Sequence, residues 1–155
     1  MKIAVGSDET SPVVDQVVKT LKEQGYEIQF YGPTGKGMIP WTEVGRCVAE
    51  DVARRHVQEG ILFCWTGTGV SIAANKVAGI RAALCSDAET ARGARLWNDA
   101  NVLCISLRLT SAPVAQEILK AWLETEYQPN PEDDACLAEI RDMEDCSGRG
   151  ETYGP

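Results

Sequence analysis

Residues 60–76, GILFCWTGTGVSIAANK, decide the fold of this chain. Gly60–Cys64 is a continuous apolar run of the kind that forms a strand buried on both faces. The alternate glycines Gly67 and Gly69 then let the backbone turn tightly, and Gly67–Lys76 continues as a helix. A buried strand that leads through such a turn into a helix is the repeating unit of a parallel sheet.

The same alternation of short apolar runs and longer amphipathic stretches continues on both sides of this segment. The expected strands are residues 2–5, 26–31, 60–64, 80–85 and 101–105. The expected helices are residues 11–24, 40–58, 67–76, 87–97 and 111–125, the last with Ser111 as its cap and Pro113 in its first turn. This order predicts an α/β fold, a five-stranded parallel sheet with helices on both faces.

The pattern changes after residue 127, so we divide the chain into a domain of residues 1–127 and a C-terminal segment of residues 128–155. Pro129, Pro131 and the acidic run 132–134 interrupt the periodicity, and residues 135–143 could form one more helix. Residues 147–155 are expected to be loosely ordered. The segment is either a solvated tail or a helix that packs on a partner subunit.

Composition excludes several functions. The chain has 15 Lys and Arg against 23 Asp and Glu, a net charge of −8, which disfavours nucleic acid and anionic membranes as partners. No apolar run approaches the length of a membrane span, and the N-terminus has no signal-peptide core, so we expect a cytoplasmic protein. The single histidine, His56, and six cysteines without paired spacing predict no metal site.

Three segments carry unusual chemistry: residues 6–10 (GSDET), residues 64–71 (CWTGTGVS) and residues 97–101 (WNDAN). Because open parallel sheets bind ligands beyond the carboxyl ends of their strands, we expect all three to line one site.

The second segment is the most informative. Open backbone N–H groups and the start of the following helix would hold an anion, and could lower the pKa of the Cys64 thiol. Thr66 and Ser71 add hydroxyl donors. The alternative is that Cys64 only packs in the core and that the glycine-rich segment is only a backbone turn, because neither GxGxxG nor a P-loop motif is present.

Residues 60–84, the block NDANVL at 98–103, the opening KIAVGSD and the helix start Pro40-Trp41 together resemble the ribose-5-phosphate isomerase B and galactose-6-phosphate isomerase family. The resemblance covers roughly residues 1–127. It implies a Rossmann-like three-layer fold and a homodimer or homotetramer with active sites built from two subunits. The implied reaction is aldose–ketose isomerisation through a cis-enediolate, without metal or organic cofactor.

The resemblance also implies roles for single residues. Cys64 matches the base that moves a proton between C1 and C2, and Thr66 matches the donor that stabilises the oxyanion together with the amides around Gly67 and Gly69. Asp8 matches an aspartate that contacts sugar hydroxyls. Two further matches are Asn98, contributed across the dimer interface, and Arg108, near the phosphate.

Departures from the family pattern concern its cationic groups. Glu9 and Trp97 stand where histidines are usual, the latter being the one that opens the sugar ring, and Trp65 replaces a glycine. Residues 129–132 (PNPE) replace a Gly-Gly-Arg-His signature, and two more acids follow. We therefore predict that the proton-transfer machinery is kept while the phosphate clamp is lost. The substrate would then be a sugar other than ribose 5-phosphate, with Trp65 and Trp97 stacking on it.

Two alternatives stay open. One is an isomerase or epimerase of a keto-sugar or sugar acid, which needs no ring opening and hence no histidine. The other is a non-catalytic partner subunit, since galactose-6-phosphate isomerase pairs two related chains. Cys85 and Cys104 are expected to be core thiols, and Asn75 to stabilise a helix end.

Overall fold

The computed structural model describes residues 1–35 and 37–148, and the side chains of these except residues 146–148. The strands are β1 (Lys2–Ser7), β2 (Glu27–Tyr31), β3 (Glu59–Cys64), β4 (Ala82–Leu84) and β5 (Val102–Ser106). The helices are α1 (Pro12–Glu23), α2 (Trp41–Ala53), α3 (Thr68–Ala74), α4 (Ala88–Asn98), α5 (Ala112–Leu123) and α6 (Pro131–Gly148).

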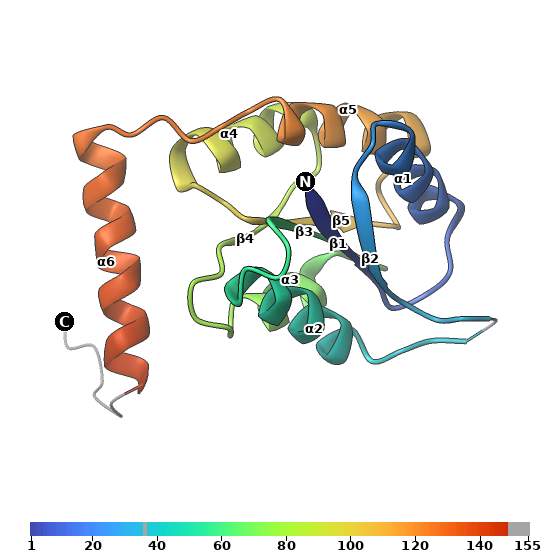
Figure 1. Cartoon of the computed structure of the whole chain (residues 1–155), viewed down its shortest axis with the longest axis horizontal. Helices are drawn as coiled ribbons and strands as arrows, with labels where there is room; N and C mark the ends of the chain where they lie inside the picture. The colour runs from blue at the N-terminus through green and yellow to red at the C-terminus, as the bar shows by residue number, and fades with distance from the viewer. Residues whose placement is uncertain (36, 149–155) are drawn as a thin grey trace.

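All five strands are parallel and lie in the order β2-β1-β3-β5-β4. Helices α1, α4 and α5 cover one face of the sheet, and α2 and α3 cover the other (Figure 1). Side chains alternate between the two cores, as the strand period requires: Ile3 and Val5 face α1 and α5, whereas Ala4 faces α2. The predicted three-layer α/β fold is confirmed.

Several element boundaries differ from the prediction for local reasons. Helix α2 ends at Ala53 rather than residue 58, because Arg55 takes a left-handed conformation with φ of 58°. Strand β4 has three residues instead of six, and the side chain of Asn75 pairs with the N–H and the C=O of Ala82 at 2.8 and 2.9 Å. The expected role of Asn75 at a helix end is thus observed. Ser111 precedes α5 but makes no side-chain capping bond.

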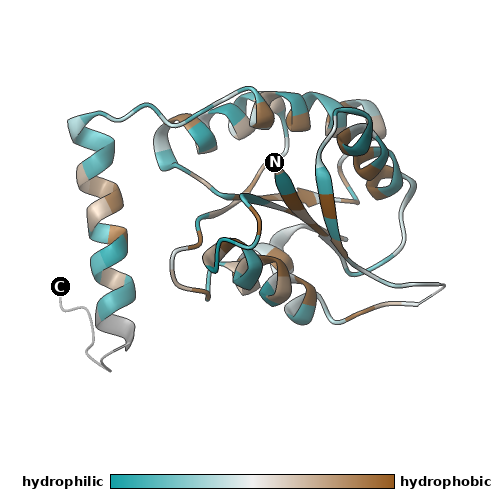
Figure 2. Ribbon diagram, viewed as in Figure 1, coloured by the Kyte–Doolittle hydropathy of each residue, from teal (hydrophilic) through white to brown (hydrophobic). Residues whose placement is uncertain are grey.

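The C-terminal helix is longer than expected and stands apart from the three layers (Figure 1). Asn130 caps it by accepting the Asp133 N–H at 2.9 Å, so the helix starts four residues before the predicted residue 135. The Glu144 carboxylate fastens it to the body by accepting the Gly79 N–H at 2.9 and 3.0 Å. Figure 2 shows apolar residues among polar ones along α6, and Ile140 and Met143 are exposed. Of the end predicted to be loosely ordered, residues 147–148 belong to α6 and the remainder lies outside the described residues.

Candidate active site

The carboxyl ends of β1, β3 and β5 meet at one edge of the sheet. The chain runs from β1 outward to β2 and then returns to β3 on the other side of β1, so the strand order reverses at this place. The register pairs Ser7 with Phe63 and Cys64 with Ser106, which brings Asp8 level with Cys64. A crevice at such a reversal is where open α/β sheets bind ligands.

Backbone hydrogen bonds fix the loop that follows Cys64. The Cys64 carbonyl accepts the N–H groups of Gly67 at 3.2 Å and Leu107 at 3.0 Å. The next carbonyl, that of Trp65, accepts the Arg108 N–H at 2.9 Å and the Ser106 hydroxyl at 3.0 Å. The loop after β3 is therefore held against the end of β5, and the Cys64 side chain is buried beneath it with 4% of its surface exposed.

Gly67 starts α3 in a conformation that only glycine adopts without strain. Its φ is 75°, and a Cβ atom would lie 2.4 Å from Leu84 Cδ1 and 3.1 Å from the backbone of Ile105 and Ser106. Beside it, the hydroxyls of Thr66 and Thr68 lie 2.7 Å apart. The tight turn thus sets two hydroxyls and the unpaired first-turn amides of α3 next to the Cys64 strand end.

Asp8 is the second polar group at this edge. Its side chain is buried, with 6% exposed, and Oδ1 has no hydrogen-bond partner among the described residues. Burial, and then the neighbouring Glu9 charge, raise the pKa of Asp8. Because buried polar atoms are nearly always hydrogen-bonded in folded proteins, this oxygen is available to accept a hydrogen bond.

The remaining predicted residues of this edge differ in their availability. Trp65 is exposed directly after Cys64, and the exposed Arg108 guanidinium forms no ion pair with any residue that the structure describes. Ser71, in contrast, is half-buried. Burial raises the pKa of the Cys104 thiol, and the Ser71 hydroxyl faces this thiol closely enough to lower that pKa by a smaller amount. Arg108 therefore carries an exposed positive charge beside the crevice, whereas Ser71 lies deeper, next to Cys104.

Trp97 and Asn98 do not join these groups within one chain. They end α4, which leads into the start of β5, and β5 starts level with Gly60 rather than Cys64. The four-residue offset amounts to roughly 13 Å along a strand. Within one chain the third segment therefore does not join the other two, because residues 97–101 precede a strand instead of following one.

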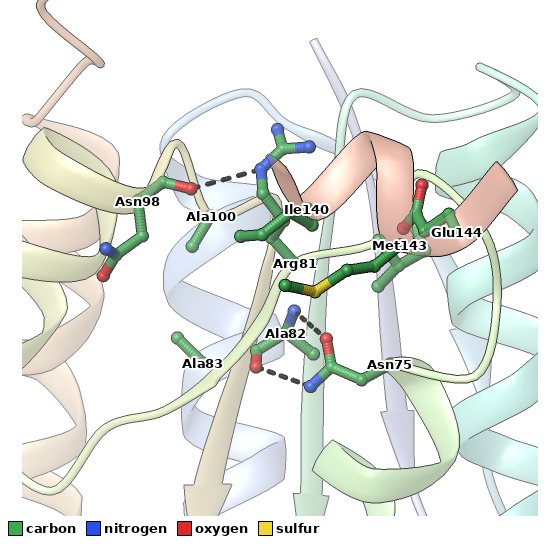
Figure 3. Close-up of a pocket in the computed structure, with 10 residues that line it drawn as sticks. Asn75, Arg81, Ala82, Ala83, Asn98, Ala100, Ile140, Met143 and Glu144 are labelled. Carbon is green, nitrogen blue, oxygen red and sulfur yellow. Dashed lines mark hydrogen bonds between the residues drawn. The ribbon is translucent and has the colours of Figure 1, made fainter. Parts of the chain in front are cut away.

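A cavity of about 440 Å³ lies at this opposite edge, between β4 and α6 (Figure 3). Arg81 Nε donates to the Asn98 carbonyl at 3.1 Å, and Figure 3 shows the Asn98 side-chain amide directed away from Arg81. Ile140, Met143 and Glu144 of α6 form the other wall. Trp97 is exposed nearby, with 57% of its surface in solvent.

The other titratable groups serve the scaffold. His56 Nδ1 lies 3.2 Å from Asp51 beyond the end of α2, before the start of β3 and therefore at the opposite edge of the sheet from Cys64. Cys85 and Cys104 are buried, as expected of core thiols, and burial raises the pKa of Cys85 to about 12. The structure's described part contains no cluster of three metal-binding side chains and no helix long and apolar enough to cross a membrane.

Comparison with known proteins identifies the family. Residues 3–140 match the model of the ribose/galactose isomerase family. The chain belongs to this family. Ribose-5-phosphate isomerase B of Escherichia coli is 39% identical over 128 residues, which cover 82% of this chain and 86% of that one. D-erythrulose-4-phosphate isomerase of Pectobacterium atrosepticum is 36% identical over 131 residues, 83% and 86% of the two chains. The solved structure of Clostridium thermocellum ribose-5-phosphate isomerase B has a TM-score of 0.91 at 36% identity, covering 95% of this chain and 99% of that one.

Membership in the ribose/galactose isomerase family confirms the predicted resemblance and enzyme class. The acids near the start of α6, however, have structural partners. Asp134 accepts the Tyr127 hydroxyl at 2.7 Å, and Asp133 accepts from the Asn130 amide at 2.6 Å. Two of the three acids that were expected to oppose a phosphate thus stabilise the helix start. Glu132 makes neither contact and remains exposed.

One contact at the site of this isomerase has no signal in the sequence. A Cβ atom on Gly69 would lie 2.9 Å from Trp41 Cδ2 and 3.0 Å from Trp41 Cε3, so the indole lies against the Gly69 backbone. The two residues are far apart in sequence, and the helix start Pro40-Trp41 resembles the family without pointing to Gly69. Only the packing of α2 on α3 brings them together.

Proposed function

We propose that this chain is an aldose–ketose isomerase in which the Cys64 thiolate moves a proton between C1 and C2 of an open-chain sugar. The thiolate removes the proton from C2 of the aldose, which gives a cis-enediolate, and returns it to C1, while the hydroxyl proton passes from O2 to O1. The observation that carries the proposal is the juxtaposition of Cys64 with the unpartnered, buried Asp8 carboxylate.

The enediolate needs hydrogen-bond donors that are already in place, because a carbon acid is weak. The Thr66 hydroxyl and the first-turn amides of α3 next to Gly67, that of Gly69 among them, are the candidates, since they lie at the end of the Cys64 strand; the Gly67 N–H itself donates to the Cys64 carbonyl. Asp8 would accept from a sugar hydroxyl through its free Oδ1, and the exposed Trp65 ring would stack on the sugar. Each group thus has a distinct part in binding or proton transfer.

We further propose a substrate other than ribose 5-phosphate, either a free sugar or a sugar phosphate of another shape. Arg108 is the cation available beside the crevice, and Glu9 adds negative charge where a dianion would have to bind. Loss of two charge-assisted hydrogen bonds corresponds to about 3–6 kcal/mol of binding free energy. Such a loss would lower kcat/KM for ribose 5-phosphate by about 10²–10⁴-fold.

A substrate screen tests this choice. Purified protein is assayed with ribose 5-phosphate, galactose 6-phosphate, erythrulose 4-phosphate and their unphosphorylated counterparts. The highest kcat/KM is expected on a substrate other than ribose 5-phosphate. Ribose 5-phosphate as the best substrate would overturn the proposal about specificity and leave the proposed reaction intact.

The placement of Asn98 and Trp97 supports a site completed by a second copy of the chain. These residues lie at the opposite edge from Cys64, near α6, the helix that lies apart from the three layers. In a symmetric dimer they can therefore face the partner's Cys64 edge. Mixing inactive Cys64→Ala and Asn98→Ala chains tests the arrangement. Random reassociation would leave one intact site in each mixed dimer and restore about a quarter of the parent activity. No recovery from mixtures shown to contain mixed dimers would contradict it.

A second candidate is an isomerase or epimerase of keto-sugars or sugar acids that needs no ring opening. It is favoured by the one histidine of the chain, which pairs with Asp51 away from the crevice. Activity on a sugar acid, without activity on any aldose–ketose pair of the screen, would support it. A non-catalytic subunit would catalyse no exchange of the sugar C–H with solvent.

A further inference from the structure

We infer that Trp41 is a positioning residue of the isomerase site, which holds the glycine loop in register with Asp8. The inference rests on the proposed function, because it assigns Trp41 a task in the reaction at Cys64. In the sequence Trp41 was part of the helix start that resembles the family, but it was not among the predicted site residues. Trp41 acts through its contact with Gly69 and through residues 38–40, which directly precede Trp41.

The first contact is that of the indole with Gly69. A Cβ on Gly69 would lie 2.9, 3.0 and 3.3 Å from Trp41 Cδ2, Cε3 and Cγ, so the ring and the loop backbone are in direct contact. Gly69 belongs to the first turn of α3, whose unpaired amides are the candidate oxyanion donors. The indole therefore limits how far this turn can move toward α2.

The second contact joins the same segment to the Asp8 loop. The Ile39 N–H donates to the Asp8 carbonyl at 2.9 Å, and Met38 forms a β-bridge with Glu9. Two residues later Trp41 starts α2. Residues 38–41 thus contact both halves of the crevice, the Asp8 loop through the backbone and the glycine loop through the indole.

A third contact makes the α2–α3 interface stiff. A Cβ on Gly45, one turn after Trp41, would lie 2.9 Å from Ala73 Cβ and 3.1 Å from the Val70 carbonyl oxygen. The two helices therefore approach at backbone distance, and close-packed interfaces transmit small displacements. Loss of the indole would release the first turn of α3, while the Gly45 contact would keep the helices together.

The roles of Trp41 and Gly69 are tested by a double-mutant cycle. Trp41→Ala is expected to lower kcat by about 10- to 100-fold with a smaller change in KM, because displaced donors weaken the transition state more than the bound sugar. Trp41→Phe still covers Gly69 and should recover most of the rate. Gly69→Ala should be damaging in the parent and nearly silent in Trp41→Ala, where the added methyl has room.

Activity is measured as solvent deuterium incorporation with the best substrate of the screen described above, and stability by urea unfolding. Phe30→Ala is the matched control: Phe30, on the edge strand β2, has the same exposed fraction, 43%, and its ring covers Gly32, the residue after that strand. It should keep the parent kcat. Multiplicative effects of Trp41→Ala and Gly69→Ala, or an unchanged kcat in Trp41→Ala, would overturn the inference.

Cys64→Ala in the same assay separates the two proposals. If Cys64→Ala keeps full exchange, the proposed function fails whatever Trp41 does. If Cys64→Ala abolishes exchange and Trp41→Ala does not slow it, only the role of Trp41 fails. Should Trp41→Ala not fold, Trp41→Phe and its combination with Gly69→Ala carry the same test, because the smaller ring leaves more room for the added methyl.

Discussion

Replacing Gly67 with alanine should destabilise the fold and disrupt the site together. The left-handed conformation, with φ of 75°, costs an alanine about 1–2 kcal/mol. The new Cβ would lie 2.4 Å from Leu84 Cδ1, which can move, and 3.1 Å from the backbone of Ile105 and Ser106, which cannot move without displacing β5. Such overpacking adds about 1–3 kcal/mol, so the free energy of unfolding should fall by about 2–5 kcal/mol.

Urea unfolding measures this loss, and Gly25→Ala isolates its two causes. Gly25 has a similar φ of 86°, but its Cβ would meet no atom within 4 Å. It should therefore lose only the conformational part, about 1–2 kcal/mol, and keep its activity. Equal destabilisation by the two substitutions would refute the account of Gly67, because it would mean that the loop is free to move away from β5.

Three further predictions concern charged groups. Because the pKa of Asp8 is raised, the folded chain binds the Asp8 proton more tightly than the unfolded chain does, and the free energy of unfolding falls as the pH rises above 3.8. In urea unfolding Asp8→Asn should therefore be more stable than the parent at pH 7, and the difference should vanish below pH 3.8. Arg95→Met leaves the buried Glu59 carboxylate, now 2.7 Å from Arg95, without its ion-pair partner. The free energy of unfolding should therefore fall by about 3–5 kcal/mol at pH 7, and by less at a pH low enough to protonate Glu59. An equal fall at both pH values would contradict this. The Glu144 carboxylate accepts the Gly79 N–H, so Glu144→Ala should speed amide hydrogen exchange at Gly79. Unchanged exchange would mean that other contacts hold α6 to the body.

The fold could be predicted from the sequence because the central strands β1, β3 and β5 carry apolar runs and helices such as α1 and α2 carry a one-sided apolar stripe. The boundaries that failed depend on contacts distant in sequence. Strand β4 is shortened where Asn75 binds the backbone of Ala82, and Arg55 ends α2 five residues early. The start of α6 was missed although Asn130, a good helix cap, was visible, because the prolines around it were read as an interruption.

Only the part of the candidate site that follows from strand direction could be predicted from the sequence. Residues that follow strands, Asp8 and Cys64 among them, meet at one edge because parallel strands share the direction of their carboxyl ends. Asn98 precedes a strand and lies at the other edge of its own chain, so its expected contribution across a dimer interface stays a prediction. The contact of Trp41 with Gly69 could not be predicted, since only the packing of α2 on α3 creates it.

The central claim is that the Cys64 thiolate moves the proton, and solvent deuterium incorporation at the sugar carbon next to the carbonyl tests it most directly. Cys64→Ala is compared with Cys136→Ser, which alters an exposed thiol on α6. The account predicts that the parent and Cys136→Ser incorporate deuterium at the same rate, whereas Cys64→Ala incorporates none above the uncatalysed rate. Deuterium incorporation by Cys64→Ala at the parent rate would contradict it.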